Sequence, residues 1–162
     1  MTEVSRLLQL IDNAPRCQVL RARGLPSLRE GDVLPDDLME FFRLAGGARL
    51  FDGSEYPIRI VGPEEFIRSN PEIVGAESAD DLTDTWYIVA RGSREEALSI
   101  DCSPSRTGRC YDSFWDRHGV VGDCRIVAKS FGELLRRLYE NAGGYWYWLG
   151  SDAPNYGDAY ER

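Results

Sequence analysis

The sequence predicts an α+β fold: a single domain with a mostly antiparallel sheet and helices packed around it. Two observations carry this prediction. Amphipathic helical patterns lie near both ends of the chain, and between them short strand-like segments follow one another through short loops, without the regular alternation of strand and helix that a parallel sheet requires. The length of 162 residues suits one domain and is enough to bury a hydrophobic core without disulfides or a metal.

The first helix is expected at residues 2–12, where apolar residues recur with helical spacing. Its predicted buried stripe consists of Val4, Leu7, Leu8 and Ile11. Residues 13–33 contain two prolines and no periodic pattern, so we expect an irregular segment there.

The stretch "LPDDLMEFFRLAGGARLFDG", residues 34–53, predicts a second helix. Pro35 is tolerated in a first turn, and the two aspartates that follow favour the positive end of the helix dipole. Gly46 and Gly47 come after the last periodic apolar residue. A phosphate-binding loop would precede a helix, where free amide groups point at the anion, so these glycines are interpreted as the end of the helix.

The centre of the chain is predicted to supply the sheet. "GPEEFIRSN", residues 62–70, is expected to form a short helix from its proline onward, and residues 71–85 are expected to form an acidic loop. The segments with β-branched, aromatic or alternating residues predict the strands. The expected strands are residues 48–51, 58–61, 85–91, 96–103, 108–114 and 124–128.

The last helix begins at Ser130, since Ser130 and Glu133 form the S-x-x-E pattern of a capping box. A left-handed residue near Gly143 should end it. The aromatic run "YWYWL" is expected to pack back on the core. Residues 150–162 contain few aliphatic side chains, so we place the core at about residues 34–149 and expect a flexible tail after it.

Several motifs of this chain resemble those of the SUKH domain family, also called the cell-wall-assembly regulator-like domain. Residues 34–53 are similar to the family's Leu-Pro, acidic helix start and terminal glycine, with Ala45-Gly46-Gly47 where Asn-Asn-Gly is commoner. "GPEEFIRSN", "YIVARGSREEALSIDCS" and "IVAKSFGELLRRLYENAGGYWYWL" follow in the family's order, although the second lacks the usual glycine before its second strand.

The resemblance covers about residues 34–149 and implies an α+β fold with helices packed around one sheet. It also implies a role in protein binding. Many bacterial members are immunity proteins that bind and neutralise a toxin, and others are intracellular interaction modules. The family has no shared catalytic residues, so the resemblance implies none here.

Composition excludes some classes of partner. The net charge of −8 disfavours binding to nucleic acid and to anionic membranes, which require clustered lysine and arginine. No apolar run approaches the roughly 20 residues of a membrane helix, and the first residues do not resemble a signal peptide. We therefore expect a cytoplasmic protein whose partner is a basic protein surface, such as a nuclease toxin.

Two segments combine the residue types expected at such an interface. In "YDSFWDRH" the candidates are Tyr111, Asp112, Trp115 and Asp116, where carboxylates would steer a basic partner and aromatic side chains would supply affinity. In the acidic loop the candidates are Asp80, Asp81 and Asp84. For Trp115 the sequence leaves core packing and partner contact open. Trp86 is expected in the core, and Trp146 and Trp148 are expected to face opposite ways.

The only histidine, His118, would have to serve any Ser-His-Asp or Cys-His catalytic unit. It lies in a polar stretch beside a glycine, which favours a surface loop. Together with Cys102, Cys110 and Cys124 it completes a Cys₃His set, but the spacings of seven, seven and five residues differ from those of structural zinc sites. We expect free thiols, no metal and no cofactor.

Three functions follow as hypotheses. The first is a non-enzymatic immunity protein that binds and occludes a toxin. The second is a general interaction or regulatory module of the same fold. The third is a small hydrolase or metal-dependent enzyme that uses His118 or a pair of carboxylates.

Overall fold

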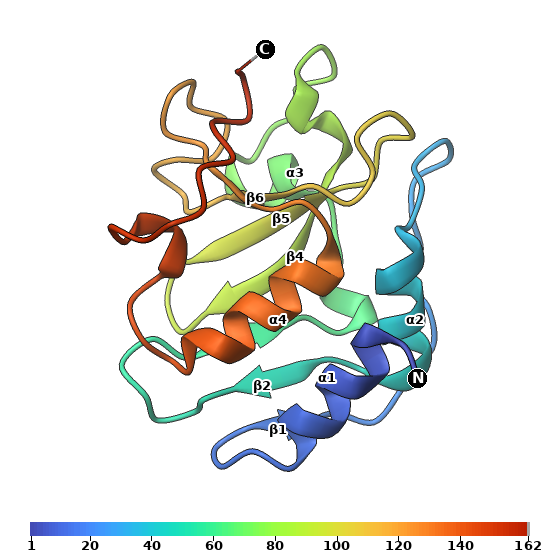
Figure 1. Ribbon diagram of the computed structural model, residues 1–162. Coiled ribbons are helices and arrows are strands. Elements are labelled where there is room, and N and C mark those ends of the chain that lie inside the picture. Colours follow the sequence, from blue (N-terminus) through green and yellow to red (C-terminus); the bar gives the residue numbers. More distant parts are fainter. Residues whose placement is uncertain (162) are drawn as a thin grey trace.

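Residues 1–161, which the computed structural model describes, form one antiparallel sheet of seven strands with helices packed on it (Figure 1). The strands are neighbours in the order of the sequence, and this arrangement confirms the predicted α+β fold. The strands are β1 (Gln18–Val19), β2 (Ala48–Leu50), β3 (Ile58–Ile60), β4 (Trp86–Gly92), β5 (Ala97–Asp101), β6 (Cys110–Asp112) and β7 (Ile126–Ala128). The helices are α1 (Glu3–Asp12), α2 (Asp36–Leu44), α3 (Ser69–Ile73) and α4 (Phe131–Asn141), and the 3₁₀ turns are η1 (Pro63–Glu65), η2 (Leu82–Thr85) and η3 (Tyr147–Leu149).

The helices are divided between the two faces of the sheet. α1, α2 and α4 contact one another, and α4 lies across the sheet with α1 beside it (Figure 1). On the other face, η1 and α3 are joined to the strands by ion pairs between Glu65 and Arg59 and between Glu72 and Arg91. Arg59 and Arg91 alternate with buried strand residues, so their side chains leave the sheet on the face opposite the main core.

The helix ends follow from local chemistry. Thr2 caps α1, since its hydroxyl accepts a hydrogen bond from the Ser5 amide at 3.1 Å. Ser130 caps α4 by accepting from the Glu133 amide at 3.1 Å, as the sequence predicts. The Glu133 carboxylate, however, accepts from the amide of Lys129 at 2.7 Å and not from that of Ser130.

The two glycines follow α2, as predicted, but the helix already ends at Leu44, since Ala45 is extended. The glycines allow a close backbone approach. Gly47 has a φ of 123°, which side-chain-bearing residues rarely adopt. A Cβ on Gly46 would lie 2.1 Å from the carbonyl oxygen of Arg21, so only glycine fits beside the segment that follows β1. The chain then enters β2, which pairs with β1 and β3.

The short helix expected from residue 63 to residue 70 is broken in the structure. η1 ends at Glu65, and the backbone leaves the helical conformation at Phe66. The ring of Phe66 is buried between Phe42 of α2 and Tyr87 of β4, on which it stacks with ring centroids 5.0 Å apart. α3 begins at Ser69 and reaches into the expected loop, and η2 occupies the end of that loop. Tertiary packing of one aromatic ring therefore overrides the local helix pattern.

Three of the four tryptophans lie in the core. Trp86 is fully buried, as expected. The prediction that Trp146 and Trp148 face opposite ways is wrong: their exposures are 5% and 1%, and the rings stack on each other with centroids 5.4 Å apart. The strand alternation behind that prediction does not apply, since this segment forms the 3₁₀ turn η3.

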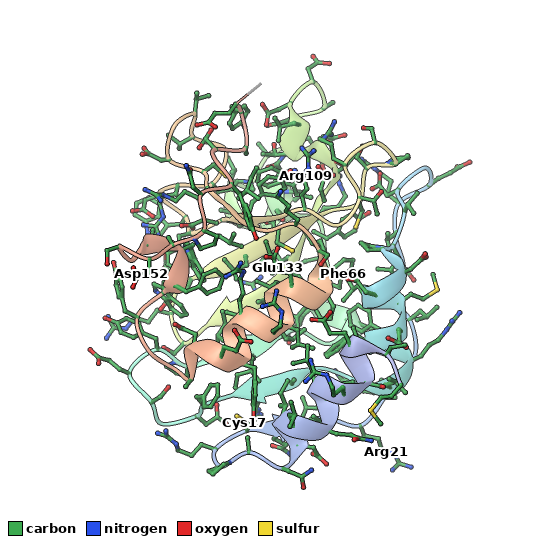
Figure 2. All side chains as sticks on the ribbon, in the orientation of Figure 1. Cys17, Arg21, Phe66, Arg109, Glu133 and Asp152 are labelled. Carbon is green, nitrogen blue, oxygen red and sulfur yellow. The ribbon has the colours of Figure 1, made fainter. Side chains whose placement is uncertain are left out.

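The segment after residue 150, which we expected to be flexible, is packed along the edge strand β7. The Ile126 amide donates to the carbonyl of Gly157 at 3.0 Å, and the Ala159 amide donates to that of Cys124 at 2.8 Å. Tyr156 donates its hydroxyl hydrogen to Glu133, which Figure 2 shows on α4. The core also extends before residue 34, since the stripe of α1 is buried.

Within residues 1–161, no helix is long and apolar enough to cross a membrane.

Candidate protein-binding site

The loop after β6 is organised by a buried carboxylate. Asp112, the last residue of β6, is fully buried and accepts three hydrogen bonds: from the Phe114 amide at 3.1 Å, from Nε of Arg117 at 2.7 Å, and from the Trp148 indole at 3.0 Å. Burial raises the pKa of Asp112, while the Phe114 amide and the Arg117 charge act in the opposite direction. Asp112 therefore shapes the loop and is not exposed to a partner, which corrects the expectation from the sequence.

Trp115 is presented outward by this loop. Its neighbour Phe114 is buried, whereas Trp115 is 67% exposed. The carboxylate of Asp116 follows it and is also exposed. This exposure excludes core packing for Trp115, one of the two alternatives that the sequence left open.

Trp115 forms one wall of a groove with a volume of about 470 Å³. The turn between β4 and β5 and the segment after α4 form the other walls. Tyr145, which is 54% exposed, is the second accessible aromatic side chain in the groove. The groove is lined by Arg94, Glu95, Glu96, Phe114, Trp115, Asp116, Arg117, Tyr145, Trp146 and Leu149.

The base of the groove is a packed group of aromatic rings. Trp146 contacts Phe114 edge-to-face with centroids 5.7 Å apart, and it contacts Tyr56 in the same way at 5.3 Å. Tyr56 in turn packs edge-to-face on Tyr145 at 5.5 Å. Tyr145 therefore stands on a packed aromatic support, whereas Trp115 is positioned by the loop that Asp112 holds in place. A side chain that is held in position loses little conformational entropy when a partner binds.

Tyr111, the remaining candidate in this stretch, is 1% exposed and stacks on Trp86 with centroids 3.8 Å apart. Together with Cys124 these two rings form a small second core beneath the C-terminal segment. The expectation that Tyr111 contacts a partner is therefore contradicted by its burial.

The acidic loop supplies fewer free carboxylates than its sequence suggests. Asp81 accepts from the amide and hydroxyl of Thr83, at 3.1 and 2.6 Å, and from the hydroxyl of Tyr160 at 2.8 Å. Asp84 is paired with Arg29 at 3.1 Å and with Arg68 at 2.7 Å. Of the three candidates in this loop, Asp80 alone is exposed to solvent.

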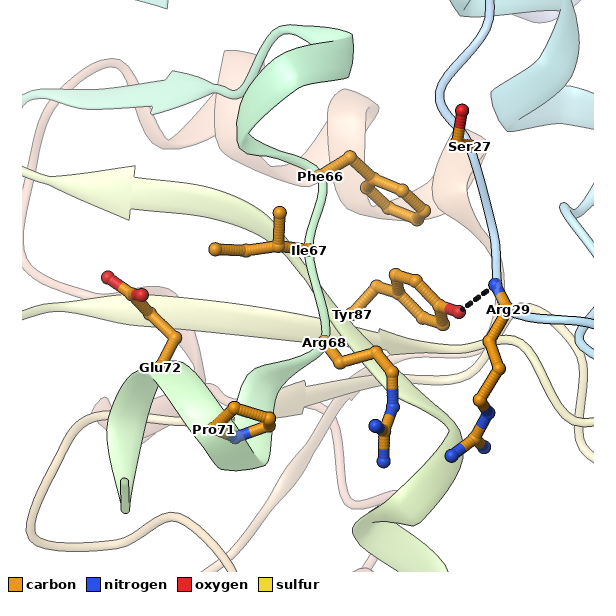
Figure 3. Close-up of a pocket in the computed structure, with 8 residues that line it drawn as sticks. All are labelled: Ser27, Arg29, Phe66, Ile67, Arg68, Pro71, Glu72 and Tyr87. Carbon is orange, nitrogen blue, oxygen red and sulfur yellow. Dashed lines mark hydrogen bonds between the residues drawn. The ribbon is translucent and has the colours of Figure 1, made fainter. Parts of the chain in front are cut away.

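The two arginines that hold Asp84 also line a cavity of about 390 Å³ (Figure 3). Figure 3 shows Arg29 and Arg68 extending in the same direction beside Tyr87, whose hydroxyl accepts from the Arg29 amide at 3.0 Å. The aromatic rings of this cavity are almost fully buried, and its guanidinium groups are already paired with Asp84 and, for Arg68, with Glu77. The cavity thus has no free charge or exposed ring to offer a ligand.

His118 is buried, which contradicts the expected surface position. Its Nδ1 lies 2.9 Å from the hydroxyl of Ser113 and its Nε2 lies 2.7 Å from the amide oxygen of Asn70. Both ring nitrogens are therefore used within the fold. Burial lowers the pKa of His118 to about 4, so the ring is neutral at pH 7.

The contacts of His118 belong to a continuous chain of buried hydrogen bonds. On one side, Asn70 donates to Thr83 at 2.9 Å, and Thr83 donates to Asp81. On the other side, the hydroxyls of Ser113, Ser99 and Ser69 follow one another at 2.6 and 2.7 Å. This chain joins the loop of Trp115 to α3, to η2 and, through Asp81, to the C-terminal segment.

The cysteines are free thiols, and Cys102, Cys110 and Cys124 are buried. Burial raises the pKa of each of these three thiols well above its usual value, so they stay protonated at pH 7. In the described part of the chain, no group of three or more His, Cys, Asp or Glu side chains is arranged to hold a metal ion.

Tyr145 and Glu95 of the groove were not predicted from the sequence. Tyr145 lies in an aromatic run that reads as core, and Glu95 lies in a polar turn. Their approach to Trp115 depends on the tertiary arrangement of three separate segments, so no local signal could have identified them.

The fold and the exposed aromatic groove define an α+β domain with a surface suited to binding a protein. The chain belongs to the SMI1 / KNR4 family (SUKH-1), whose model matches residues 30–137, and this confirms the resemblance found in the sequence. It is 44% identical over 158 residues to a protein of Bacillus subtilis (strain 168) named "Immunity protein YokJ"; the match covers 98% of this chain and 96% of that protein.

Proposed function

We propose that this chain is an immunity protein, which binds a cognate toxin and blocks it without catalysing a reaction. The similarity to a protein named as an immunity protein over almost the whole of both chains supports the class of function. The observation that carries the mechanism is the exposure of Trp115 at 67% on a loop that Asp112 holds in place. A rigid exposed aromatic residue is the usual anchor of a protein interface.

The partner is a basic toxin domain, such as a nuclease, that acts in the cytoplasm. The net charge of −8 favours encounter with a basic surface, and exposed carboxylates lie beside Trp115, at Asp116, and on the acidic loop, at Asp80. Occlusion would be stoichiometric: electrostatic attraction speeds association, and the aromatic anchor slows dissociation.

Growth rescue tests the proposal. The toxin encoded beside the gene of this protein is expressed in a sensitive host with and without the protein, and the mixture of the two purified proteins is analysed by size-exclusion chromatography. We expect rescue and a complex of fixed stoichiometry. A general interaction module would form no complex with that toxin and restore no growth, and this result would reject the immunity function.

A further inference from the structure

The groove beside Trp115 carries a more specific inference, which rests on the proposed function. We propose that this groove binds an arginine side chain of the toxin, with the guanidinium group against the faces of Trp115 and Tyr145 and its N–H groups directed at the carboxylates of the rim. The groove thus determines which basic surface the protein recognises, in addition to attracting basic surfaces in general.

The two accessible rings are free to accept a cation. Trp115 takes part in none of the close aromatic pairs of residues 1–161, and Tyr145 is in one such pair, with Tyr56, and is still 54% exposed. Within the same residues, no guanidinium or ammonium group lies over either ring, although Phe114 in the base of the groove is covered by the guanidinium of Arg117 at 4.4 Å. The ring of Phe114 therefore already has a cation from the protein over it, whereas the rings of Trp115 and Tyr145 have none from the described part of the chain.

The charges of the groove favour a cation. Asp116 and Glu95 are exposed at its rim, and Glu96 lies beside them and accepts from the Arg94 amide at 3.0 Å. Of the two arginines in the lining, Arg117 is paired with the buried Asp112 at 2.7 Å, and its Nη1 also lies 4.0 Å from Asp116. Arg94 remains as an opposing charge, and it is exposed and carried on a turn.

Arginine fits these features better than lysine. Its planar guanidinium stacks on aromatic faces and offers paired N–H groups to a carboxylate, whereas the ammonium of lysine is strongly hydrated and acts as a point charge. The volume of about 470 Å³ accommodates an extended arginine side chain with water.

A probe experiment tests the groove without the toxin. N-acetyl-arginine amide is titrated into the ¹⁵N-labelled protein at constant ionic strength, and the indole N–H resonance of Trp115, assigned with Trp115→Phe, is followed by NMR. N-acetyl-citrulline amide, which has the same shape and no charge, is the control. We expect a saturable shift with the arginine amide and at least a tenfold weaker response to citrulline. Equal responses, or no response at Trp115, would overturn the inference.

Variants test the same groove against the toxin. Trp115→Ala and Tyr145→Ala should each weaken toxin binding by about 30-fold or more, whereas Leu44→Ala, which removes an exposed apolar side chain from α2, should change it less than twofold. Asp116→Asn should weaken binding and Arg94→Gln should strengthen it, each about two- to fivefold, while Asp12→Asn, an equal charge change at an exposed position of α1, serves as the matched control.

The outcomes separate the two proposals. If the unmodified protein neither rescues growth nor binds the toxin, the immunity function fails. If it does both and the Trp115 and Tyr145 variants bind equally well, the function stands and the arginine site is rejected. A lysine amide that shifts the Trp115 resonance as strongly as the arginine amide would also reject it.

Discussion

The loops at the two ends of β6 are built on the same plan and present different residues to solvent. In "DCSPSR", Asp101 accepts from the Ser103 amide at 2.9 Å, from Nε of Arg106 at 3.0 Å and from the Trp86 indole at 3.2 Å. In "DSFWDR", Asp112 accepts from a backbone amide two residues on, from the Nε of an arginine five residues on, and from the indole of Trp148. Both aspartates are fully buried at the end of a strand.

The difference lies at the third residue after each aspartate. The first loop exposes Pro104 there, and the second exposes Trp115. A carboxylate that accepts hydrogen bonds from a backbone amide, an arginine and an indole therefore fixes the conformation of its loop. This role is structural, since the same arrangement occurs in the first loop, which exposes no aromatic residue. The residue at the tip is what makes one of the two loops a candidate interface.

The largest expected effect comes from removing the carboxylates. Asp101→Ala and Asp112→Ala should each lower the free energy of unfolding by about 3–5 kcal/mol, since each leaves a buried indole N–H and an arginine without their partner. Urea unfolding at pH 7 measures both. Asp101→Asn and Asp112→Asn, which keep the size and one acceptor oxygen, should lose less.

If the two loops share one design, the losses should be similar. If an alanine variant at one of the two positions lowers the free energy of unfolding by less than about 1 kcal/mol, the hydrogen bonds of that aspartate contribute little to stability. The two aspartates would then not have the same structural role.

The next effect should distinguish the loops by pH. His118 joins the Asp112 loop to α3 and η2, and no hydrogen bond of this histidine reaches the Asp101 loop. Its pKa of about 4 in the folded protein lies below the usual value of 6.5, so the unfolded chain binds the proton more readily. The stabilisation is fully present above pH 6.5 and is lost as the pH falls towards 4, by up to about 3 kcal/mol.

Urea unfolding of the protein and of His118→Gln between pH 7 and pH 4.5 measures this effect. The variant should show a flatter pH dependence. Amide hydrogen exchange at pH 4.5 should increase in residues 113–119 more than in residues 102–109. Equal increases in the two loops would contradict a local role for His118.

A smaller effect should come from the indole groups. Trp86→Phe and Trp148→Phe each remove one N–H donor to a buried carboxylate, and we expect each to lower the free energy of unfolding by about 1.5–3 kcal/mol. Since Trp148 also stacks on Trp146 at the base of the groove, only Trp148→Phe should weaken toxin binding. Toxin binding that is weakened equally by Trp86→Phe would show that the effect is one of global stability.

The sequence predicted the parts of the fold that depend on near neighbours. The stripes of α1 and α4, the glycine pair after α2 and the long strands β4 and β5 are each encoded within about a dozen residues, so periodicity and capping patterns suffice. The break between η1 and α3 was missed, because the stacking of Phe66 on Tyr87 joins residues 21 positions apart.

The site was predicted less well for the same physical reason. Asp112 reads as a surface carboxylate in a polar stretch, and its burial depends on Trp148, which lies 36 residues away in the chain. His118 is buried through Asn70, at a separation of 48 residues. Trp115 and Asp116 are exposed, which needs no distant partner, and their role in binding stays a prediction.

The smallest expected effect on stability concerns the tips of the two loops. Trp115→Ala should change the free energy of unfolding by about 0.5 kcal/mol or less. Pro104→Ala should lower it by up to about 1 kcal/mol, because the unfolded chain gains conformational freedom when the proline is removed. Thermal unfolding and urea unfolding measure both. A small loss in Trp115→Ala would show that this exposed ring is not needed for folding, as expected of a residue that serves binding. A loss above 2 kcal/mol in Trp115→Ala would instead make this ring part of the packing, and the contrast between the two loops would lose its functional meaning.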